Sequence, residues 1–401
     1  MEDDVDGFRR VPRLHVHDAS PAPPTLMYWS RAPVWGQLPT HRMRSHSATV
    51  VDSSVIWLFG GCDDKSFWRD VWCLDVETME WSRPETVGDI PPPCRAHTAT
   101  LVDRKIFVFG GGQGNMYYNS LYILDTVSRR WTQVPFTNSN AVTSTSSTPA
   151  SGHSHTLSAG ASSTEDDAIS ALASPSLAPA PLAPSPALSS LNEEFVPRPR
   201  RAHTTVLYKN RLVVFGGGNG ATALNDVWML EVVGVPPDRM RWQKQRTTGS
   251  KPSPRGYHTA NLVGNIMIVV GGSDGRQTFS DIYCLNLDTF HWSTIRAEKP
   301  YRRLAHTSTQ IGSYLFIMGG HDGSAYTNDL LLFNLVSLQY EPRPVKGIAP
   351  SPRGYHASVL ADGRLWLFGG YDAKTAHDDV HMLELASSAY LSQVTGFFVN
   401  V

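Results

Sequence analysis

Histidine is the residue of this chain with the widest scope for chemistry, because its fifteen imidazole side chains could bind a metal or transfer protons near neutral pH. Six of them recur in one sequence context: His46, His97, His203, His258, His306 and His356. A catalytic or metal site needs different groups that converge on one point, whereas one group at one repeated position is typical of a structural repeat. We therefore interpret these six as partly buried strand residues bonded to neighbouring backbone.

Paired glycines accompany these histidines at a fixed distance. The pair begins thirteen residues after each histidine, or fourteen in the first copy, at Gly60, Gly110, Gly216, Gly271, Gly319 and Gly369. A phosphate-binding loop would need a helix to start after the glycines, and a strand pattern follows instead. The pairs are better explained as backbone positions that need a positive φ.

Two further landmarks complete the repeat. Ten residues after the first glycine stands a small polar residue, at Asp70, Ser120, Asp226, Asp281, Asp329 and Asp379. An aromatic residue follows eleven positions later, at Trp81, Trp131, Trp292, Tyr340 and Tyr390, and is delayed to Trp242 in the third copy. Between the landmarks lie short β-branched and aromatic runs bounded by Gly, Asn and Asp, which predict hairpins.

A repeat of about 50 residues with four strands predicts the blade of a β-propeller. The double glycine after an apolar strand, with the spaced aromatic residue, resembles the kelch repeat family over roughly residues 28–385. The expected fold is an all-β, six-bladed propeller of kelch repeats with four antiparallel strands per blade. The pair Tyr28-Trp29 behaves as an orphan fourth strand that could complete blade six, a place for which Tyr390 competes.

The composition divides the chain into a propeller and three other segments. Residues 27–386 form the expected propeller, and residues 1–26 and the Ser/Thr/Ala/Pro-rich insert 137–194 are expected to be disordered. Residues 387–401 form a C-terminal tail. The insert joins blades two and three, so it should emerge beside the loops between strands two and three.

The charge and cysteine content indicate the setting of the protein. A formal net charge of −1 without a basic run gives no indication of nucleic acid binding, and no apolar run is long enough for membrane insertion. The four cysteines lack metal-type spacing and fit reduced core positions. We expect a cytoplasmic protein with no cofactor, and the sequence carries no signal for an oligomeric state.

The loops between strands two and three differ from blade to blade, so symmetry does not explain their residues. They carry aromatic side chains surrounded by charged ones on one face, which is the composition of a protein-recognition surface. The candidate partner-binding residues in these loops are Lys65, Phe67, Trp68, Tyr117, Tyr118, Arg276, Phe279, Tyr326, Tyr371 and Lys374.

Arginines precede the repeated histidines in two registers. Arg200, Arg255, Arg303 and Arg353 lie three residues before the histidine, whereas Arg44, Arg95 and Arg201 lie two before it. Kelch propellers that bind acidic or phosphorylated peptides use strand-one arginines near the channel mouth. By that resemblance the first set is expected to contact carboxylates or phosphates of a partner. Ion pairs with the loop aspartates are the alternative for the same four residues.

The kelch resemblance also raises a metal-enzyme alternative, because some relatives are galactose-oxidase-like copper enzymes and others are specifier-protein-like iron enzymes. The copper type needs a Cys–Tyr crosslink, and two of the four cysteines here occupy core positions. The iron type resembles a Glu-x3-Asp-x3-His run, which this sequence lacks. The densest set of potential ligands is Asp372, His377, Asp378 and His381. We favour a non-catalytic scaffold or adaptor, for example a substrate receptor or a cell-polarity or signalling scaffold, that binds other proteins.

Overall fold

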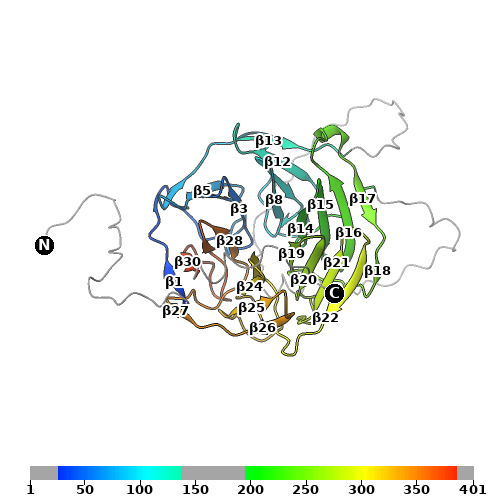
Figure 1. The fold of residues 1–401 in the computed structure, drawn as a ribbon. Coiled ribbons are helices and arrows are strands. Elements are labelled where there is room, and N and C mark those ends of the chain that lie inside the picture. Colours follow the sequence, from blue (N-terminus) through cyan, green and yellow to red (C-terminus); the bar gives the residue numbers. More distant parts are fainter. Residues whose placement is uncertain (1–25, 137–194, 386–401) are drawn as a thin grey trace, which may run out of the picture.

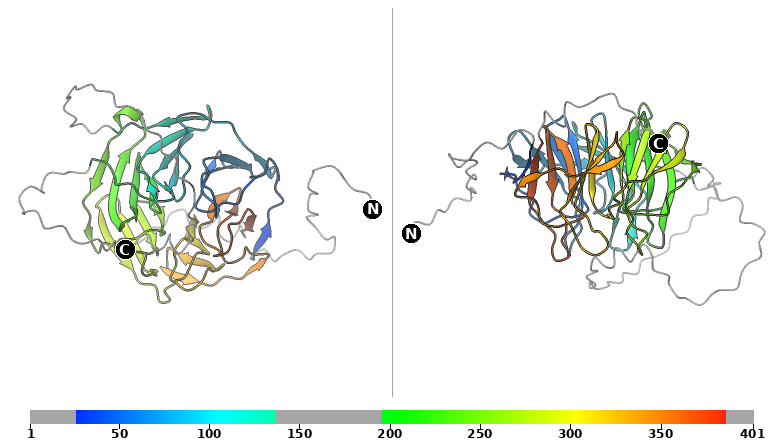
Figure 2. Two further views of the ribbon diagram at one scale, coloured as in Figure 1. Left: turned by 180° about the vertical axis from the view of Figure 1, so that it is seen from behind. Right: turned by 60° about the horizontal axis from the view of Figure 1, so that its bottom comes forward.

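The computed structural model describes residues 26–136 and 195–385, and almost every element in them is a β-strand. Six sheets of four or five strands stand around a central axis (Figure 1). Views from behind and from the side show that the sheets form a closed ring (Figure 2). The chain is therefore the six-bladed, all-β propeller that the repeat predicted.

Blades one to three each contain four antiparallel strands, which follow one another in order from the axis to the rim. Blade one has β3 (Ser47–Val51), β4 (Val55–Phe59), β5 (Val71–Asp75) and β6 (Glu80–Ser82). Blade two has β8 (Thr98–Val102), β9 (Lys105–Phe109), β12 (Leu121–Asp125) and β13 (Arg130–Gln133). Blade three has β14 (Thr204–Tyr208), β15 (Arg211–Gly218), β16 (Ala223–Glu231) and β17 (Trp242–Gln245).

Blades four to six repeat this arrangement. Blade four has β19 (Thr259–Val263), β20 (Ile266–Val270), β21 (Ile282–Asn286) and β22 (His291–Ile295). Blade five has β23 (Thr307–Ile311), β24 (Tyr314–Met318), β25 (Leu330–Asn334) and β26 (Gln339–Glu341). Blade six has β28 (Ala357–Ala361), β29 (Arg364–Phe368), β30 (Val380–Glu384) and, as its fourth strand, β1 (Met27–Arg31).

The smaller elements lie in loops and at the rim. A hairpin of β10 (Gly112–Gln113) and β11 (Met116–Tyr117) lies in the loop after β9, and one 3-10 turn (Pro237–Arg239) precedes β17. Four blades gain a short fifth strand that pairs in parallel with the fourth: β2 (Trp35–Gly36), β7 (Val87–Gly88), β18 (Thr248–Gly249) and β27 (Val345–Gly347). The sequence analysis did not predict these rim strands.

The N-terminal strand closes the ring. β1 pairs antiparallel with β30, and Trp29 lies opposite Leu383 and is buried. The closure expected for Tyr28-Trp29 is therefore present, and it gives β30 a partner on its outer edge. The competing residue Tyr390 and the segments 1–25, 137–194 and 386–401 lie outside the described residues, so the expected disorder of the insert stays a prediction.

Apolar and aromatic side chains fill the space between neighbouring blades. The aromatic landmark of one blade packs on a phenylalanine of strand two in the preceding blade: Trp131 on Phe59 (ring centroids 5.0 Å apart) and Trp242 on Phe109 (4.8 Å). The same contact joins Trp292 to Phe215 at 5.1 Å. The repeated aromatic residue is thus a packing element between blades, as its periodicity indicated.

Each glycine pair lies where strand two meets the neighbouring backbone. Gly60 and Gly61 have φ values of 66° and 91°, in the region that favours glycine. A Cβ on Gly61 would lie 2.8 Å from Cβ of His46, and one on Gly60 would lie 2.6 Å from the carbonyl oxygen of Cys94. Both conformation and close approach therefore require glycine here, which confirms the structural interpretation of the pairs.

Candidate functional site

The central channel is bounded by a closed ring of backbone hydrogen bonds. Six residues, each directly before a repeated histidine, donate their amide to the carbonyl oxygen of the equivalent residue in the preceding blade at 2.7–2.9 Å: Ser45, Ala96, Ala202, Tyr257, Ala305 and Tyr355. All six have positive φ values between 52° and 58°. With the histidines that follow them, they line a small cavity of 140 Å³. The ring holds the first strands of all blades in register.

The repeated histidines bond to the neighbouring blade through side chains. Nε2 of His97 lies 2.9 Å from the Ser47 hydroxyl, and Nε2 of His203, His258, His306 and His356 lies 2.9–3.1 Å from the threonine hydroxyls of Thr98, Thr204, Thr259 and Thr307. The sequence had indicated backbone partners and did not predict these hydroxyl partners in the neighbouring blade. Burial lowers the pKa of His97 to about 4 and those of His46, His306 and His356 to about 3. These buried, neutral rings therefore hold blades together.

The four arginines expected to contact a partner lie in the interior. Arg200, Arg255, Arg303 and Arg353 are at most 5% exposed. Each pairs with the landmark aspartate of its own blade. Arg200 contacts Asp226 through two hydrogen bonds of 2.7 and 2.9 Å, and Arg255 and Arg353 bond in the same way to Asp281 and Asp379. Arg303 makes a single hydrogen bond of 2.5 Å to Asp329.

This pairing determines what these arginines can do. Burial alone would raise the pKa of Asp226, but the hydrogen bonds and charge of Arg200 hold it below its ordinary value. Arg353 has the same effect on the pKa of Asp379 against the same burial. Contact with a partner's carboxylate or phosphate needs a guanidinium whose charge is not already paired, whereas these groups are bound by the protein's own carboxylates. The alternative of internal ion pairs describes the structure, but the partners are the landmark aspartates that open strand three and not the loop aspartates.

The other arginine register faces the mouth of the channel. We call Arg44, Arg95 and Arg201 the mouth arginines; they come from blades one, two and three. Each guanidinium lies over a loop aromatic of the preceding blade: Arg44 over Tyr371 at 4.2 Å, Arg95 over Phe67 at 5.5 Å and Arg201 over Tyr117 at 4.5 Å. Backbone bridges such as Arg44 to Cys62 and Arg95 to Gly112 hold them beside the loops.

Tyrosines take the opposite half of the mouth. Tyr257 and Tyr355 contact each other edge to face at 5.4 Å, and Tyr326 lies 6.4 Å from Tyr355 and 6.1 Å from Tyr371. In blade six the position of a mouth arginine is Gly354, where a Cβ would lie 3.0 Å from the Tyr326 ring. Burial raises the pKa values of Tyr326 and Tyr355 above the ordinary value, so both keep their hydroxyl proton. The mouth thus has a cationic half and a phenolic half.

The remaining candidate residues lie on the face that carries the loops 62–69, 112–119, 218–225, 273–280, 321–328 and 371–378, which we call the loop face. Lys65, Arg276 and Lys374 are exposed at its rim. Trp68 is half-buried and stacks on His41 at 3.8 Å, and Tyr118 packs against the core between blades one and two. Phe279 is buried under Arg255, 4.3 Å from its guanidinium.

Sequence reasoning noted the mouth arginines but chose the other register. It also missed Tyr257 and Tyr355 and the stacking partner His41. The available signal was the asymmetry among blades: the residue two before the histidine is arginine in three consecutive blades and Gly256, Leu304 or Gly354 in the others. Symmetric packing does not require such a difference.

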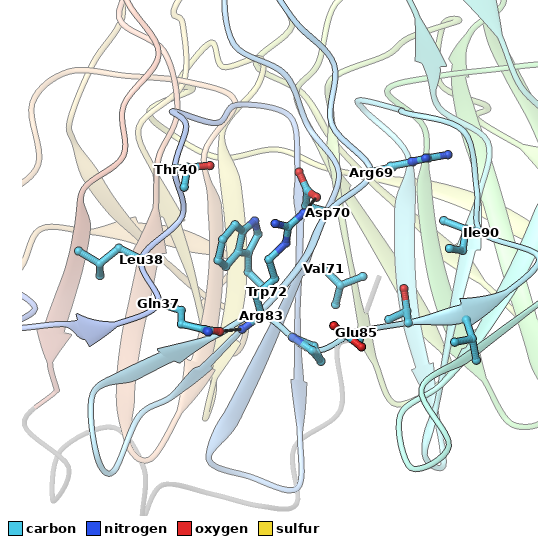
Figure 3. A pocket seen from close by; sticks show the side chains of 13 residues that line it. Gln37, Leu38, Thr40, Arg69, Asp70, Val71, Trp72, Arg83, Glu85 and Ile90 are labelled. Atoms are coloured by element: carbon cyan, nitrogen blue, oxygen red, sulfur yellow. Dashed lines mark hydrogen bonds and ion pairs between the residues drawn. The ribbon is translucent and has the colours of Figure 1, made fainter.

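A second hollow, which we call the rim pocket, has a volume of 780 Å³ and lies at the outer side of blade one. Figure 3 shows Arg83 pointing toward Asp70 beside the Trp72 ring. Arg83 bonds to Asp70 at 2.5 Å, and its guanidinium lies 5.3 Å from the Trp72 ring. Blade one has Met43 in place of the buried arginine of blades three to six, so Asp70 is paired from outside the core.

Potential metal ligands do not gather in the described part of the chain. His377 Nε2 lies 3.3 Å from Asp372, and His381 Nδ1 lies 3.7 Å from Asp379. No group of three His, Cys, Asp or Glu side chains within residues 26–136 and 195–385 is placed to hold a metal ion. All four cysteines are buried and unpaired, and burial raises the pKa values of Cys73 and Cys284 to about 12.

Comparison with known proteins gives the family. The model of the KLHDC2/KLHL20/DRC7 Kelch-repeats domain matches residues 9–164, 189–300 and 235–395. The chain is 30% identical over 321 residues to host cell factor 2 of Homo sapiens, which is 69% of this chain and 38% of that protein. It is 28% identical over 309 residues to host cell factor 1 of Homo sapiens, covering 67% of this chain and 14% of that protein.

A plant protein matches at a similar level. The acyl-CoA-binding domain-containing protein 4 of Arabidopsis thaliana is 26% identical over 323 residues, covering 79% of this chain and 34% of that protein. The chain thus spans less than half the length of each of these relatives. The repeat landmarks, the closed six-bladed ring and the family match agree, and the chain belongs to the Kelch-repeat family of KLHDC2, KLHL20 and DRC7.

Proposed function

We propose that this propeller is a non-catalytic scaffold or adaptor that binds acidic or phosphorylated segments of other proteins with its loop face. The observation that carries the proposal is the set of three mouth arginines, each stacked on a loop aromatic and supplied by consecutive blades. A role as substrate receptor or as cell-polarity or signalling scaffold would use the same face.

The mouth arginines suit an incoming anion. A guanidinium that stacks on a ring can still donate hydrogen bonds to a carboxylate or phosphate through its N–H edge. Arg44 and Arg201 are 3% and 4% exposed and Arg95 is half-buried, so Arg95 is the most accessible of the three. Arg44 lies 3.6 Å from Asp64, whereas Arg95 and Arg201 have no carboxylate partner among the described residues. Arg201 donates to the carbonyl oxygen of Gly114 at 3.2 Å, and Arg95 donates to Sγ of Cys62 at 3.9 Å. An anionic side chain of a partner would therefore find its strongest attraction between Arg95 and Arg201.

The rest of the loop face supplies complementary contacts. Tyr326 and Tyr355 offer ring surface and hydroxyl donors opposite the arginines. Lys65, Arg276 and Lys374 are exposed at the rim, where cations attract an acidic partner at long range. Half-buried Phe67, Trp68 and Tyr117 add apolar area next to the mouth.

The histidines support a non-catalytic function. The six repeated rings are buried, and five of them bond to a hydroxyl of the neighbouring blade. General acid–base catalysis needs a titratable group within reach of a substrate and with a pKa near the working pH.

The described part of the chain has no helix long and apolar enough to cross a membrane. A cytoplasmic location is part of this proposal and is tested by cell fractionation.

The test compares partner capture by the intact protein and by the double variant Arg95→Gln and Arg201→Gln, with quantitative mass spectrometry of the captured proteins. We expect a defined set of proteins with acidic or phosphorylated segments to be lost, and their binding to weaken with added salt. The control is Arg104→Gln and Arg130→Gln, which removes two exposed arginines away from the mouth. Identical capture by all three proteins would sink the proposal, provided that circular dichroism shows them folded.

A further inference from the structure

The short fifth strands at the rim follow a glycine rule. The reference position is the buried residue that stands three positions before the repeated histidine. Gly88, Gly249 and Gly347 lie six residues before this position, and Gly36 lies seven before it in the longer first copy. These four glycines have φ values from 78° to 90°. A Cβ on any of them would lie 2.1–2.6 Å from the carbonyl oxygen of the tryptophan in strand four. Only glycine, which has no Cβ, can lie this close to the carbonyl oxygen in this conformation.

The two blades without a fifth strand in the described residues lack this glycine. Blade five has Ala297 at the position, and blade three has Glu194, which lies just outside the described residues. The segment before blade five covers its edge differently: the Glu298 amide donates to Oε1 of Gln339, and Tyr301 packs on Tyr340 at 4.9 Å. In blade three, β17 pairs with β16 alone among described strands.

The edge of blade three is also strongly cationic. The segment from Arg239 to Arg246 carries four cations in eight residues and no acid. Arg239, Arg241, Lys244 and Arg246 are all exposed. β17 lies on the outer rim of the ring, away from the channel (Figure 1). Cations on an edge strand oppose pairing with a second copy of the same edge, because like charges would face each other.

Blade two shows what such an edge accepts. Its fourth strand begins at Arg130, directly after Arg129, and the fifth strand that covers it comes from an acidic stretch with Glu85 and Asp89. The Asp89 carboxylate also accepts the Gln133 amide at 3.1 Å. The basic edge of blade two is thus covered by an acidic extended segment that places glycine beside the tryptophan carbonyl.

We propose that the edge of β17 is a second docking site, separate from the loop face, that takes an acidic extended segment of a partner as a fifth strand of blade three. The segment pairs in parallel with β17 and presents a glycine at the carbonyl of Trp242. Acidic residues on either side of that glycine face Arg239 to Arg246. Backbone pairing supplies the affinity, and the glycine and the charges supply the specificity.

The probe is a fluorescein-labelled peptide with the sequence of residues 84–93, PETVGDIPPP, measured by fluorescence anisotropy with the full chain. The matched probe replaces its glycine by alanine. We expect the first peptide to bind and the alanine peptide to bind about tenfold more weakly, because an alanine is strained at this φ and clashes with the Trp242 carbonyl. Hydrogen exchange of amides in residues 242–245 should slow only with the glycine peptide.

Protein variants locate the site. Arg239→Glu with Arg246→Glu should weaken the glycine peptide about tenfold at low salt. The control, Arg296→Glu with Lys299→Glu, makes the same charge change on the rim of blade five and should leave binding unchanged. Equal binding to both variants would overturn the proposal and would indicate that the peptide displaces β7 in blade two. No binding, or equal binding of both peptides, would also overturn it.

Two further outcomes concern other occupants of the edge. Binding that appears only after deletion of residues 139–190 would show that the protein's own insert covers β17. This result would overturn the proposal that a partner supplies the fifth strand. A shift to dimer that is lost in the Arg239→Glu, Arg246→Glu variant would assign the edge to a second copy and would equally overturn it. Neither result bears on the mouth arginines, so the two proposals fail separately.

Discussion

One alanine interrupts the hydrogen bonds that link the repeated histidines. Each histidine reaches back to the hydroxyl residue that follows the preceding histidine, but the residue after His356 is Ala357. His46 consequently has no hydrogen-bond partner among the described residues for either ring nitrogen. A buried, unsatisfied polar group is destabilising.

Replacement of Ala357 by serine should therefore stabilise the protein by about 0.5–1.5 kcal/mol, because the new hydroxyl can bond to Nε2 of His46. Urea unfolding followed by tryptophan fluorescence measures the change. The matched control is Thr307→Ala, which removes the equivalent hydroxyl from His356 and should destabilise. A loss of stability in Ala357→Ser would show that the site has no room for the hydroxyl.

The buried histidines also predict how stability depends on pH. Their pKa values of about 3 to 4 in the folded protein lie below the value of 6.5 for the exposed group, so the unfolded chain binds more protons between these limits. The free energy of unfolding should fall as pH drops below 6.5, by at most about 1.4 kcal/mol per pH unit for each histidine. His306→Gln should reduce the dependence of the unfolding free energy on pH by the contribution of one histidine.

The alternation of side-chain directions along a strand was not enough to identify the arginines at the mouth. The two registers do point to opposite sides, as the sequence indicated, but the residue directly before each histidine has a positive φ. This turn ends the alternation of the strand, so counting from the histidine does not tell which side faces the channel. The asymmetry among blades was the better guide.

At the scale of elements, the glycines of the fifth strands allow these strands to pack closely against strand four at the rim. Gly88→Ala should destabilise by roughly 2 kcal/mol or more, because a Cβ would lie 2.3 Å from the Trp131 carbonyl oxygen at a φ of 90°. Gly114→Ala is the matched control, since it also has a positive φ but no heavy atom within 4 Å of its Cβ, and should cost about 1 kcal/mol. Equal losses would mean that the close contact is unimportant.

The four main strands of each blade could be predicted from the sequence, whereas the short rim strands could not. A run such as Ile266 to Val270 has β-branched residues and glycine boundaries that predict a strand. A two-residue strand such as Trp35–Gly36 has no alternation to detect, and its evidence is a glycine at a constant distance from the next repeat. The signal was present in the sequence, but only geometry explains why glycine is needed there.

At the scale of the whole molecule, one tryptophan secures the closure of the ring. Trp29 is 2% exposed and packs in a cluster with residues of blades five and six. Trp29→Ala should lower the free energy of unfolding by about 3–5 kcal/mol. Trp35→Ala, at a tryptophan that is 47% exposed on the rim, should change it by less than about 1 kcal/mol. Similar losses in both would show that β1 does not hold the ring closed.

The closure also orders events during synthesis. Among the strands of the described propeller, β1 is the first to leave the ribosome and its partner β30 is the last to be made. At roughly 5–20 residues per second, translation keeps β1 without its partner for about half a minute. Nascent blades one to five must persist as an open arc in that time, so the exposure of the propeller to chaperones is set by translation speed and ends when the final blade captures β1.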